Sequence, residues 1–457
     1  MDQYDIIILG GGPGGYVAAI KAGQSGKKVA VIEKDNIGGV CLNWGCIPTK
    51  AMLKTAKVYK QFLNAEKYGL NIPIKDINID LKLIKERKDK IVLRLTNGVK
   101  GLLKNAGVTV INGFGTVVDK NTIKVNNQVL HTTNLILATG AHPFIPNIEG
   151  LQKAIDLNKA VTSKELLDLD VLPSSLVIIG GGVIGVEFAT LYSNLGTKVT
   201  IIEQGPIILS SIDDEIRKAY MRLLKNKNLT IITEGKVTKV NDQAITYMKN
   251  EIKQEIPYDK VLVSVGTRPN LKGLENLNLE TTPIGVVTNN KLETNIQGVY
   301  AIGDLNGKMM LAHVASAEGI VAVENILGEK SELNYNRVPY GIYGFPEIAY
   351  VGLTEEAAKE QNLDYKVSIF PLSANGKALA EGESDGFIKI IADKNYGELI
   401  GIHILAVHAT DMISEAVTTM ELEGTVYEIA KAIHPHPTLS EIVMEAAHGI
   451  IDKPIHI

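Results

Sequence analysis

The chain of 457 residues is poor in cysteine and in aromatic residues, with two cysteines, one tryptophan and 5% aromatics. Two cysteines cannot form the disulfide framework of a small secreted domain, so a cytoplasmic protein is expected. No uninterrupted apolar run reaches membrane-spanning length, and the first residues are acidic, unlike the basic start of a signal peptide. The formal net charge of -4 provides no basic surplus for nucleic acid or an anionic membrane, so neither is an expected partner.

Both cysteines lie in one short stretch, GGVCLNWGCIPTK at residues 38–50. An ideal helix would separate Cys41 and Cys46 by about 7.5 Å along its axis. The Cα atoms of a disulfide are only about 4.4–6.8 Å apart, so we expect Cys41 in an irregular turn. Gly45 permits such a turn, and Pro48 is tolerated in a first helical turn, so a helix should begin near Cys46.

A helix that begins at Cys46 would favour a thiolate there, because the N-terminal end of a helix is positive. Lys50 follows four residues later and should share the same helix face. The alternative is a pair of buried, inert cysteines, a common fate of intracellular cysteine. Inert cysteines explain neither the spacing nor the glycines, so we favour a redox-active pair.

A dinucleotide-binding pattern opens the chain. Its parts are a strand at residues 4–9, Gly10, Gly12 and Gly15, a helix at residues 16–22, a strand at residues 28–32, and Glu33. The first glycine allows a tight turn, the second lets a pyrophosphate approach the backbone, and the third lets helix and strand pack closely. The acid can accept a ribose hydroxyl. Glycine-rich turns also occur for steric reasons, but this context favours a nucleotide site.

The same pattern occurs a second time. Its parts are a strand at residues 175–179, Gly180, Gly182 and Gly185, a helix containing Glu187, a strand at residues 197–202, and Glu203. Two complete patterns predict two dinucleotides bound at once. An acid at Glu203 would repel a 2′-phosphate, so the nicotinamide cofactor should be NAD rather than NADP. The alternative, one decayed copy, is disfavoured because both copies keep the three glycines and the acid.

The remaining segments supply further elements. Residues 50–103 should be helical, with an apolar face formed by Leu81, Ile84, Ile91, Leu95 and Val99. Strand-like residues precede Gly113, Thr139, Gly140, Gly266 and Asp304. The ending at Gly266 mirrors the one at Gly140, which favours insertion of one nucleotide domain into the other. Asp304 ends its strand, where an acid could bind sugar hydroxyls.

The C-terminal part changes character after residue 337. Residues 387–392 and 399–405 are expected to be antiparallel strands. The stripe of Ile413, Ala416, Val417 and Met420 is expected to be packing in a helix. Near the end, His436 and Glu441 could form a histidine–carboxylate base, or Thr438 and Glu441 could form only a capping box. We expect no metal site, because no complementary cluster of cysteine and histidine ligands lies nearby in sequence.

Together and in this order, these motifs resemble the two-cysteine flavoprotein disulfide reductases over the whole chain. The resemblance rests on residues 39–50, on Ala-Ile-Gly-Asp at 301–304 and on His-Pro-Thr-Leu-Ser-Glu at 436–441. The sequences of these motifs are most similar to those of the branch that oxidises dihydrolipoyl groups. The resemblance implies an α/β fold with two Rossmann-like domains, the second inserted in the first, and a C-terminal α+β dimerisation domain. The implied boundaries are 1–146 and 269–336 for the FAD-binding domain, 147–268 for the NAD-binding domain and 337–457 for the interface domain.

The resemblance also implies the cofactors, FAD and NAD, and their binding residues. FAD would be bound by Gly10, Gly12, Gly15, Glu33, Lys50, Gly113, Thr139, Gly140, Asp304 and Ala312, and NAD by Gly180, Gly182, Gly185, Glu203 and Gly266. Cys46 would lie against the flavin and Cys41 would exchange with substrate. Lys50 would pair with Glu187 beside the flavin ring.

The implied enzyme is a homodimer in which the partner subunit supplies the base His436 and Glu441. A dihydrolipoyl thiolate would attack the Cys41–Cys46 disulfide, and the electrons would then pass through FAD to NAD⁺. The implied protein partners are lipoyl domains of a 2-oxoacid dehydrogenase, acetoin dehydrogenase or glycine cleavage complex. The alternatives are a glutathione-type reductase, which the acid at Glu203 disfavours, and a non-catalytic, NAD-responsive flavoprotein.

Overall fold

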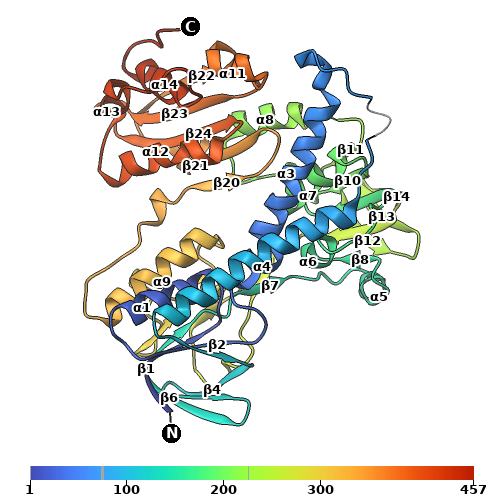
Figure 1. Cartoon of the computed structure of the whole chain (residues 1–457). Helices are drawn as coiled ribbons and strands as arrows, with labels where there is room; N and C mark the ends of the chain where they lie inside the picture. The colour runs from blue at the N-terminus through green and yellow to red at the C-terminus, as the bar shows by residue number, and fades with distance from the viewer. Residues whose placement is uncertain (1, 74–76, 225) are drawn as a thin grey trace. The chain divides into compact units, whose positions relative to one another are not determined.

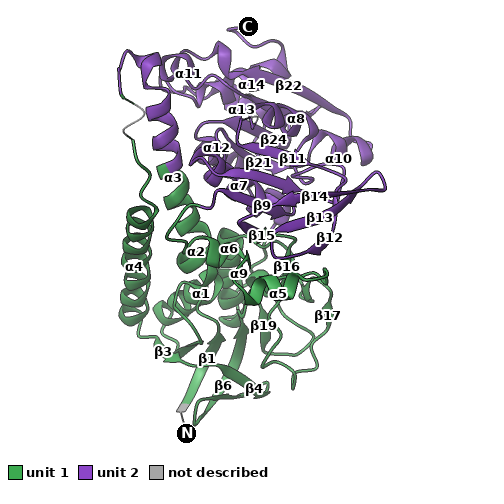
Figure 2. Ribbon diagram, turned by 90° about the vertical axis from the view of Figure 1, so that its right-hand side faces the viewer, with its two compact units in different colours: residues 1–55, 73–172, 262–333 green, residues 56–72, 173–261, 334–457 purple. Residues whose placement is uncertain are grey.

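The computed structural model describes residues 2–73, 77–224 and 226–457. The chain divides into two compact units, which Figure 2 shows in different colours. Unit 1 comprises residues 1–55, 73–172 and 262–333, and unit 2 comprises residues 56–72, 173–261 and 334–457. Each unit is therefore assembled from segments that are distant in the sequence. The predicted α/β fold is confirmed, with parallel strands around both glycine patterns and an antiparallel C-terminal sheet.

The sheet of unit 1 has the strand order β3-β2-β1-β6-β5-β4, with β19 paired to β6. Its strands are β1 (Asp2–Leu9), β2 (Val29–Glu33), β3 (Thr109–Asn112), β4 (Gly115–Asp119), β5 (Thr122–Val125), β6 (Gln128–Leu137) and β19 (Val299–Ala301). Ile8 of β1 pairs with Val31 on one side and Ile136 on the other, both in parallel register. Since β1, β2, β3, β6 and β19 run parallel, their carboxyl ends meet at one edge of the sheet.

Helices cover this sheet, as Figure 1 shows for α1, α4 and α9. The helices of unit 1 are α1 (Pro13–Gln24), α2 (Gly39–Trp44), the start of α3 (Cys46–Leu63), α4 (Leu81–Asn105), α5 (Leu151–Asp156), α6 (Ser163–Leu166) and α9 (Ala312–Ile326). Short strands add β7 (Ala141–Pro143), β8 (Ala160–Val161), β16 (Thr267–Pro269), β17 (Thr281–Thr282) and β18 (Gly285–Val286). Ala18 and Ala22 of α1 pack with Val321 and Ala322 of α9 in one buried core.

The predicted apolar face of α4 is correct for Leu81, Ile84 and Val99, which are buried, but wrong for Leu95, which is 39% exposed. The buried stripe of α4 instead includes polar residues such as Lys88. The Lys88 ammonium binds the Asp168 carboxylate at 2.8 Å, so this position is buried without being apolar. Residues 74–76, within the segment predicted to be helical, lie outside the described residues.

Unit 2 contains the second nucleotide pattern. Its elements are β9 (Ser175–Ile179), α7 (Val183–Asn194), β10 (Lys198–Ile202), α8 (Asp214–Leu223), β11 (Leu229–Ile232), β12 (Lys236–Val240), β13 (Ala244–Lys249) and β14 (Ile252–Pro257), and β15 (Lys260–Val263) leads out of the unit. Strands β9, β10 and β11 are parallel, whereas β12, β13 and β14 form a separate antiparallel sheet. The strand predicted at residues 175–179 is confirmed.

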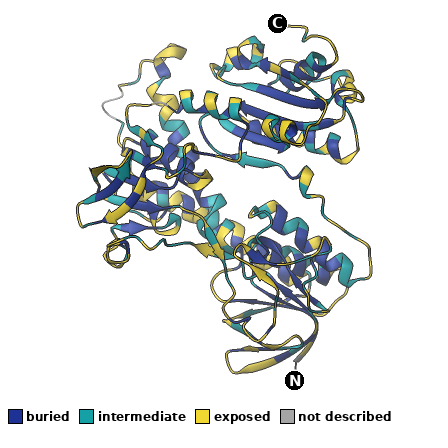
Figure 3. Ribbon diagram, turned by 180° about the vertical axis from the view of Figure 1, so that it is seen from behind, coloured by how far each residue is buried: buried dark blue, intermediate teal, exposed yellow. Residues whose placement is uncertain are grey.

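The C-terminal part of unit 2 is an antiparallel sheet of order β20-β21-β24-β23-β22. Its elements are β20 (Tyr340–Ile342), β21 (Glu347–Gly352), α10 (Glu355–Glu360), β22 (Tyr365–Pro371), α11 (Gly376–Glu381), β23 (Phe387–Asp393), β24 (Leu399–Ala406), α12 (Ala409–Glu421), α13 (Val426–Lys431) and α14 (Glu441–Ile451). The sheet is largely buried, as Figure 3 shows. Ile413, Ala416 and Met420 of α12 lie in its core, so both predicted strands and the packing stripe are confirmed.

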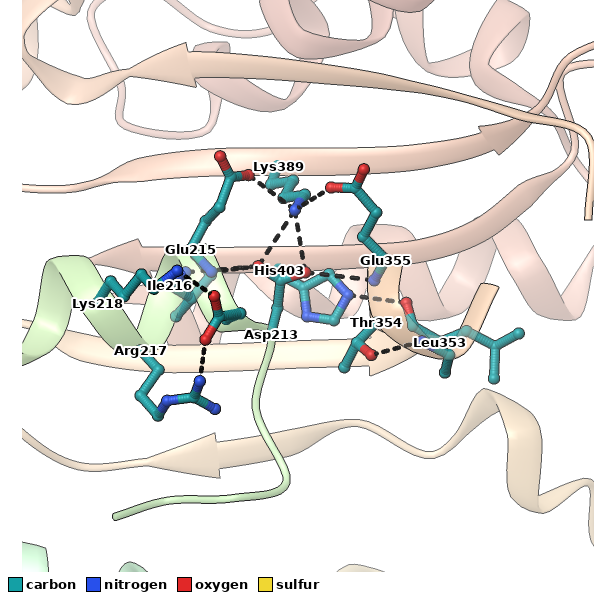
Figure 4. Close-up of polar contacts among 12 residues, drawn as sticks. Asp213, Glu215, Ile216, Arg217, Lys218, Leu353, Thr354, Glu355, Lys389 and His403 are labelled. Carbon is teal, nitrogen blue, oxygen red and sulfur yellow. Dashed lines mark hydrogen bonds and ion pairs between the residues drawn. The ribbon is translucent and has the colours of Figure 1, made fainter. Parts of the chain in front are cut away.

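A buried cluster of charges joins α8 to the C-terminal sheet, as Figure 4 shows. The side chains of Lys389 on β23 and Asp213 at the N-cap of α8 are both fully buried and bind each other at 3.1 Å. The Lys389 ammonium also binds Glu215 at 2.7 Å and Glu355 at 2.6 Å. Burial alone would lower the pKa of Lys389, but its bonds to these carboxylates raise it above the ordinary value. The ion pairs therefore fix the helix that follows the second nucleotide pattern to the sheet.

Candidate redox-active site

The first glycine loop follows β1. It needs glycine because other backbone groups lie very close to it and because Gly10 has a positive φ. Gly10 has φ of 105°, and a Cβ there would overlap the carbonyl oxygen of Ala138. A Cβ at Gly15 would overlap the carbonyl oxygen of Gly10. The loop therefore folds back on the first turn of α1, as the sequence pattern predicts.

Glu33, the acid of the first pattern, is bound to the loop itself. Its carboxylate accepts hydrogen bonds from the N–H groups of Gly11 at 2.6 Å and Asp35 at 2.7 Å. The N–H of Gly113 donates to the carbonyl oxygen of Glu33 at 2.8 Å. These bonds bring Gly11, Glu33 and Gly113 together at the carboxyl ends of β1, β2 and β3.

The local geometry fits a dinucleotide phosphate at the N-terminal end of α1. Its N-cap is Gly12, and among the described residues no side chain caps this helix end. A Cβ at Gly12 would meet only one described protein atom within 4 Å, the Cα of Gly39 at 3.8 Å. Helix N-terminal N–H groups with open space before them are suited to bind an anion. The other predicted FAD residues at this edge are Thr139 and Gly140 after β6, Asp304 after β19 and Ala312 at the start of α9.

Asp304 lies in the single 3₁₀ turn Gly303–Leu305 directly after β19. Burial raises the pKa of its carboxyl above the ordinary value. On the neighbouring strand end, the Thr139 hydroxyl donates to the carbonyl oxygen of Asn270 at 2.7 Å. The residue before Asp304's turn, Ile302, donates its N–H to Leu137 at 2.9 Å, so these strand ends are joined directly.

The cysteines lie on two consecutive helices. The prediction that a helix begins at Cys46 is confirmed, because α3 begins there. The prediction of an irregular turn around Cys41 is wrong, because Cys41 lies within the short helix α2. The chain instead breaks at Gly45, where a Cβ would lie 2.8 Å from the carbonyl oxygen of Val40. A bend between two helices thus replaces the continuous helix that would keep the sulfurs too far apart.

The segment before the cysteines lies directly on the first glycine loop. The N–H of Gly38 donates to the carbonyl oxygen of Gly11 at 2.8 Å. A Cβ at Gly39 would lie 2.6 Å from the Cα of Gly12, so the two backbones touch. Sequence reasoning missed this crossing, although the consecutive glycines before Cys41 were its signal. The redox pair and the first nucleotide loop therefore form one site within unit 1.

Both cysteines are thiols in this structure and are not joined by a disulfide. The hydrogen bond to Cys46 is the main factor that raises the pKa of the Cys41 thiol, and burial adds to it. The ammonium of Lys50 on α3 acts in the opposite direction and lowers the pKa of Cys41. Burial raises the pKa of Tyr16 on α1, and the nearby Cys41 contributes to that shift. The two thiols are thus hydrogen-bonded to each other, with the Lys50 ammonium close by.

The second glycine loop, in unit 2, repeats the geometry of the first. The Glu203 carboxylate accepts from the N–H groups of Gly181 at 2.7 Å and Gly205 at 2.6 Å. Gly182 is the N-cap of α7, and no described side chain caps it. No described protein atom lies within 4 Å of a Cβ placed at Gly182. The loop therefore also fits a dinucleotide phosphate, with Gly180 before it and Gly185 in the first turn of α7.

The remaining predicted residues lie as follows. Gly266 belongs to unit 1, where its carbonyl oxygen accepts the N–H of Phe144 at 2.9 Å. Glu187 lies on α7 in unit 2 and accepts the N–H of Tyr343 at 3.0 Å. Tyr343 is a partner of Glu187 that sequence reasoning did not find. Lys50 lies in the other unit, and its pairing with Glu187 stays a prediction.

His436 and Glu441 form a pair, with Nδ1 of the histidine 2.9 Å from a carboxylate oxygen. Burial alone would raise the pKa of Glu441, but the Thr438 N–H at 2.8 Å and His436 hold it below its ordinary value. The alternative, a capping box, is only half formed: Glu441 accepts the Thr438 N–H, but Ser440 is the N-cap and the Thr438 hydroxyl donates to the Pro435 carbonyl. The carboxylate can therefore orient the imidazole, as a histidine base requires.

Comparisons with known proteins establish the family. Residues 4–319 match the family described as pyridine nucleotide-disulphide oxidoreductase, and residues 338–447 match its dimerisation domain. The chain belongs to this family. Enzymes of this family are oxidoreductases that use FAD and NAD(H), which confirms both predicted cofactors. The dimerisation domain supports the predicted homodimer.

Similar proteins cover the whole chain. Dihydrolipoyl dehydrogenase of Bacillus subtilis is 41% identical over 478 residues and covers 99% of each chain. Dihydrolipoyl dehydrogenase of Mycoplasma genitalium is 40% identical over 452 residues, 98% of this chain and 99% of that one. The crystal structure of LpdA from Mycobacterium tuberculosis superposes with a TM-score of 0.90 at 26% identity, over 98% of this chain and all of that chain.

The described residues offer neither a membrane-spanning helix nor a clustered metal site. Among these residues, no helix combines the length and apolar character that a membrane span requires. The same part of the chain brings together no group of three or more His, Cys, Asp or Glu side chains that could hold a metal ion.

Proposed function

We propose that the protein oxidises protein-bound dihydrolipoyl groups to lipoyl groups, with NAD⁺ as the electron acceptor. The observation that carries this proposal is the thiol pair, because Cys41 and Cys46 follow a segment that touches the first glycine loop. A dithiol beside a dinucleotide loop is what a thiol-to-nucleotide electron transfer needs. The names of the full-length relatives from Bacillus and Mycoplasma support dihydrolipoyl groups as the substrate.

The two sulfurs have separate roles in this proposal. The catalytic cycle begins with Cys41 and Cys46 as a disulfide, and a substrate thiolate attacks the sulfur of Cys41. The sulfur of Cys46 leaves as a thiolate, which the N-terminal end of α3 favours. The second substrate thiolate then attacks the mixed disulfide, so the cyclic lipoyl product leaves and both cysteines are reduced. FAD held at the first glycine loop would supply the two-electron acceptor for the dithiol and the hydride donor for NAD⁺.

His436 is the proposed base. Its imidazole takes the proton from the attacking thiol, and the carboxylate of Glu441 orients the ring through the 2.9 Å contact. We assign both residues to the partner subunit's contribution to each site. Glu187 is the proposed partner of Lys50.

The proposed binding residues follow the two loops. FAD would be held by Gly10, Gly12, Gly15, Glu33, Lys50, Gly113, Thr139, Gly140, Asp304 and Ala312, and NAD by Gly180, Gly182, Gly185, Glu203 and Gly266. The open backbone at Gly12 and Gly182 supports this assignment. The proposed domain boundaries stay at 1–146, 147–268, 269–336 and 337–457.

Lipoyl domains of a 2-oxoacid dehydrogenase, acetoin dehydrogenase or glycine cleavage complex are the proposed partners. We also propose a cytoplasmic location. Both cysteines of the chain belong to the redox pair, so there is no structural disulfide that would need an oxidising compartment.

The direct test is NADH formation by purified, FAD-loaded protein with dihydrolipoamide as the substrate. We expect turnover with NAD⁺ and at least about tenfold lower efficiency with NADP⁺, because Glu203 would repel the 2′-phosphate. A tenfold difference corresponds to about 1.4 kcal/mol. Reduction of oxidised glutathione by NADPH instead would favour a glutathione-type reductase. Absence of turnover with either substrate would indicate a non-catalytic flavoprotein.

The base is tested by His436→Gln, which should lower dihydrolipoamide oxidation by about 10²–10⁴-fold while FAD and NADH still bind. The matched control is His456→Gln, because His456 also pairs with a glutamate of α14, Glu445, at 2.6 Å. The control should keep near-normal turnover. Near-normal turnover of His436→Gln, or an equal loss in the control, would contradict the role of His436.

A further inference from the structure

Helix α9 carries one buried carboxylate, and the proposed chemistry does not use it. Glu318 is fully buried and lies in the apolar sequence HVASAEGIVAV of this helix. Its two carboxylate oxygens accept separate hydrogen bonds, from the N–H of Gly303 at 2.5 Å and from the amide of Asn306 at 2.9 Å. A buried carboxylate is costly unless it is well hydrogen-bonded, so this arrangement calls for an explanation.

The two donors stand on either side of Asp304. Gly303 precedes it, and Asn306 is the C-cap of the same 3₁₀ turn. Gly303 also approaches α9 closely, because a Cβ there would lie 3.2 Å from the Cβ of Ala315. Glu318 therefore holds both ends of the turn that presents Asp304.

The residue next to Glu318 holds the other half of the proposed FAD site. A Cβ at Gly319 would lie 2.6 Å from the carbonyl oxygen of Gly14 and 3.2 Å from the backbone nitrogen of Ala18. This close approach fixes α9 on α1, whose first turn follows the glycine loop. Two consecutive residues of one helix thus join the glycine loop and the Asp304 turn.

We propose that Glu318 is a positioning residue for FAD, which sets the Asp304 turn at the distance from the glycine loop that the dinucleotide's sugar hydroxyls and pyrophosphate require. The inference rests on the proposed role of Asp304 in binding FAD. The positioning role has a physical basis: the two carboxylate oxygens of Glu318 match two donors, the Gly303 N–H and the Asn306 amide. Charge-assisted bonds of this kind are stronger than neutral ones.

The number of hydrogen-bond acceptors explains why glutamine cannot replace Glu318. Glutamine offers one acceptor and two donors, so either the Gly303 N–H or the Asn306 amide would face another donor. Rotation of the Asn306 amide does not solve this problem, because its oxygen already accepts the N–H of Lys308 at 2.9 Å. The turn must therefore shift in Glu318→Gln.

The test measures the dissociation constant of FAD by titration of apoprotein, at a temperature where circular dichroism shows each apoprotein folded. We expect Glu318→Gln to weaken FAD binding by about tenfold or more. The matched control is Glu324→Gln on the same helix, which removes the 3.2 Å ion pair with Lys21 of α1 but leaves the Asp304 turn untouched. It should bind FAD within about twofold of the unaltered protein.

A rescue variant separates positioning from general damage to the helix. In Glu318→Gln with Asn306→Asp, the glutamine oxygen can accept the Gly303 N–H and its amide can donate to the new carboxylate. This double variant should recover most of the lost FAD affinity. Normal FAD affinity in Glu318→Gln, an equal loss in Glu324→Gln, or absence of rescue would each overturn the proposal.

The proposal and the assignment on which it rests fail in different ways. Asp304→Asn tests the assignment itself and should weaken FAD binding as much as Glu318→Gln or more. If Asp304→Asn binds FAD normally, the assigned role of Asp304 is wrong and the positioning role falls with it. If Asp304→Asn binds poorly while Glu318→Gln binds normally, the assignment stands and only the role of Glu318 is overturned.

Discussion

The two glycine loops have almost the same backbone geometry. Gly10 and Gly180 have φ of 105° and 106°, and the N-cap glycines have ψ of -175° and -176°. In each loop the acid at the end of the second strand accepts a backbone N–H of the loop, at 2.6 Å for Glu33 and 2.7 Å for Glu203. The acid therefore fixes the loop in addition to any bond it makes to a ribose.

The surroundings of the two loops differ. Gly38 and Gly39 lie on the first loop, and helix α9 supports it through Gly14. At the second loop, the space beside Gly182 holds no described protein atom within 4 Å. The first loop is thus crossed on one side by a second backbone segment, and in this sense it is enclosed, whereas the space beside Gly182 is open. We interpret the enclosed loop as suited to a cofactor that stays bound and the open loop as suited to one that exchanges.

One segment that contacts the second loop is itself fixed by Lys389. The N–H of Leu209 donates to the carbonyl oxygen of Gly181 at 3.0 Å. A few residues later Asp213 binds Lys389. Removal of the ammonium leaves three carboxylates close together, and breaking a buried ion pair costs about 3–5 kcal/mol. We therefore expect the largest loss of stability from a substitution of Lys389, although this residue is remote from the glycines.

Lys389→Met should lower the free energy of unfolding by about 3–5 kcal/mol and weaken NADH binding more than FAD binding. Urea unfolding and titrations with each cofactor measure these effects. The matched control is Lys394→Met, just after the same strand, whose 3.3 Å pair with Asp364 is exposed. The control should change stability by no more than about 1 kcal/mol. Equal effects of both substitutions would contradict the role of the buried cluster.

The same cluster predicts a pH window. Burial alone would raise the pKa of Asp213, but His403 and Lys389 lower it below the ordinary value, so its contribution is present above about pH 4 and lost as pH falls further. The pKa of Lys389 is raised, so its contribution is present below about pH 10 and lost only above that. The stability gap between the protein and Lys389→Met should stay constant from about pH 5 to 9 and shrink at lower pH.

Gly15→Ala should disturb the enclosed loop, because the new Cβ overlaps the carbonyl oxygen of Gly10. Overpacking of this kind costs about 1–3 kcal/mol, and we expect loss of FAD as well as stability. Gly12→Ala is the control, since its Cβ meets the protein only at 3.8 Å. It should fold normally yet bind FAD poorly. Flavin absorbance after gel filtration measures the bound FAD of each variant, and thermal unfolding measures its stability. Normal flavin content in both variants would contradict the first loop as the FAD site.

Gly182→Ala should have the smallest effect on stability, because no described protein atom lies near the new Cβ. The methyl group occupies the space proposed for the NAD pyrophosphate, so NADH should bind about tenfold more weakly, a loss of about 1.4 kcal/mol. Flavin content should be unchanged. A variant that binds NADH normally would show that the second loop is not the nicotinamide site.

Much of the site could be predicted because its motifs are local. The glycines, Glu33 and Glu203 act within one strand–turn–helix unit, so their spacing is visible in the sequence. The crossing of Gly39 over Gly12 and the bond of Glu318 to Gly303 join segments far apart in the chain, and no short pattern encodes them. Glu318 still left a signal, since an acid within an apolar stretch of a helix needs buried partners.

The wrong predictions have similar causes. Cys41 was expected in an irregular turn because an unbroken helix would separate the sulfurs, whereas the chain bends at Gly45 and keeps helix on both sides. Leu95 was expected to be buried from its periodicity, but the buried stripe of α4 includes Lys88, whose ammonium binds Asp168. Ion pairs can bury a polar residue at a position where periodicity predicts an apolar one.

The central claim is that Cys46 serves the flavin and Cys41 serves the substrate. The direct measurement is the absorbance spectrum of the FAD-loaded variants Cys41→Ser and Cys46→Ser. We predict a long-wavelength flavin band in Cys41→Ser, which retains the Cys46 thiolate beside the flavin, and none in Cys46→Ser. Identical spectra of the two variants, or a band only in Cys46→Ser, would contradict the account.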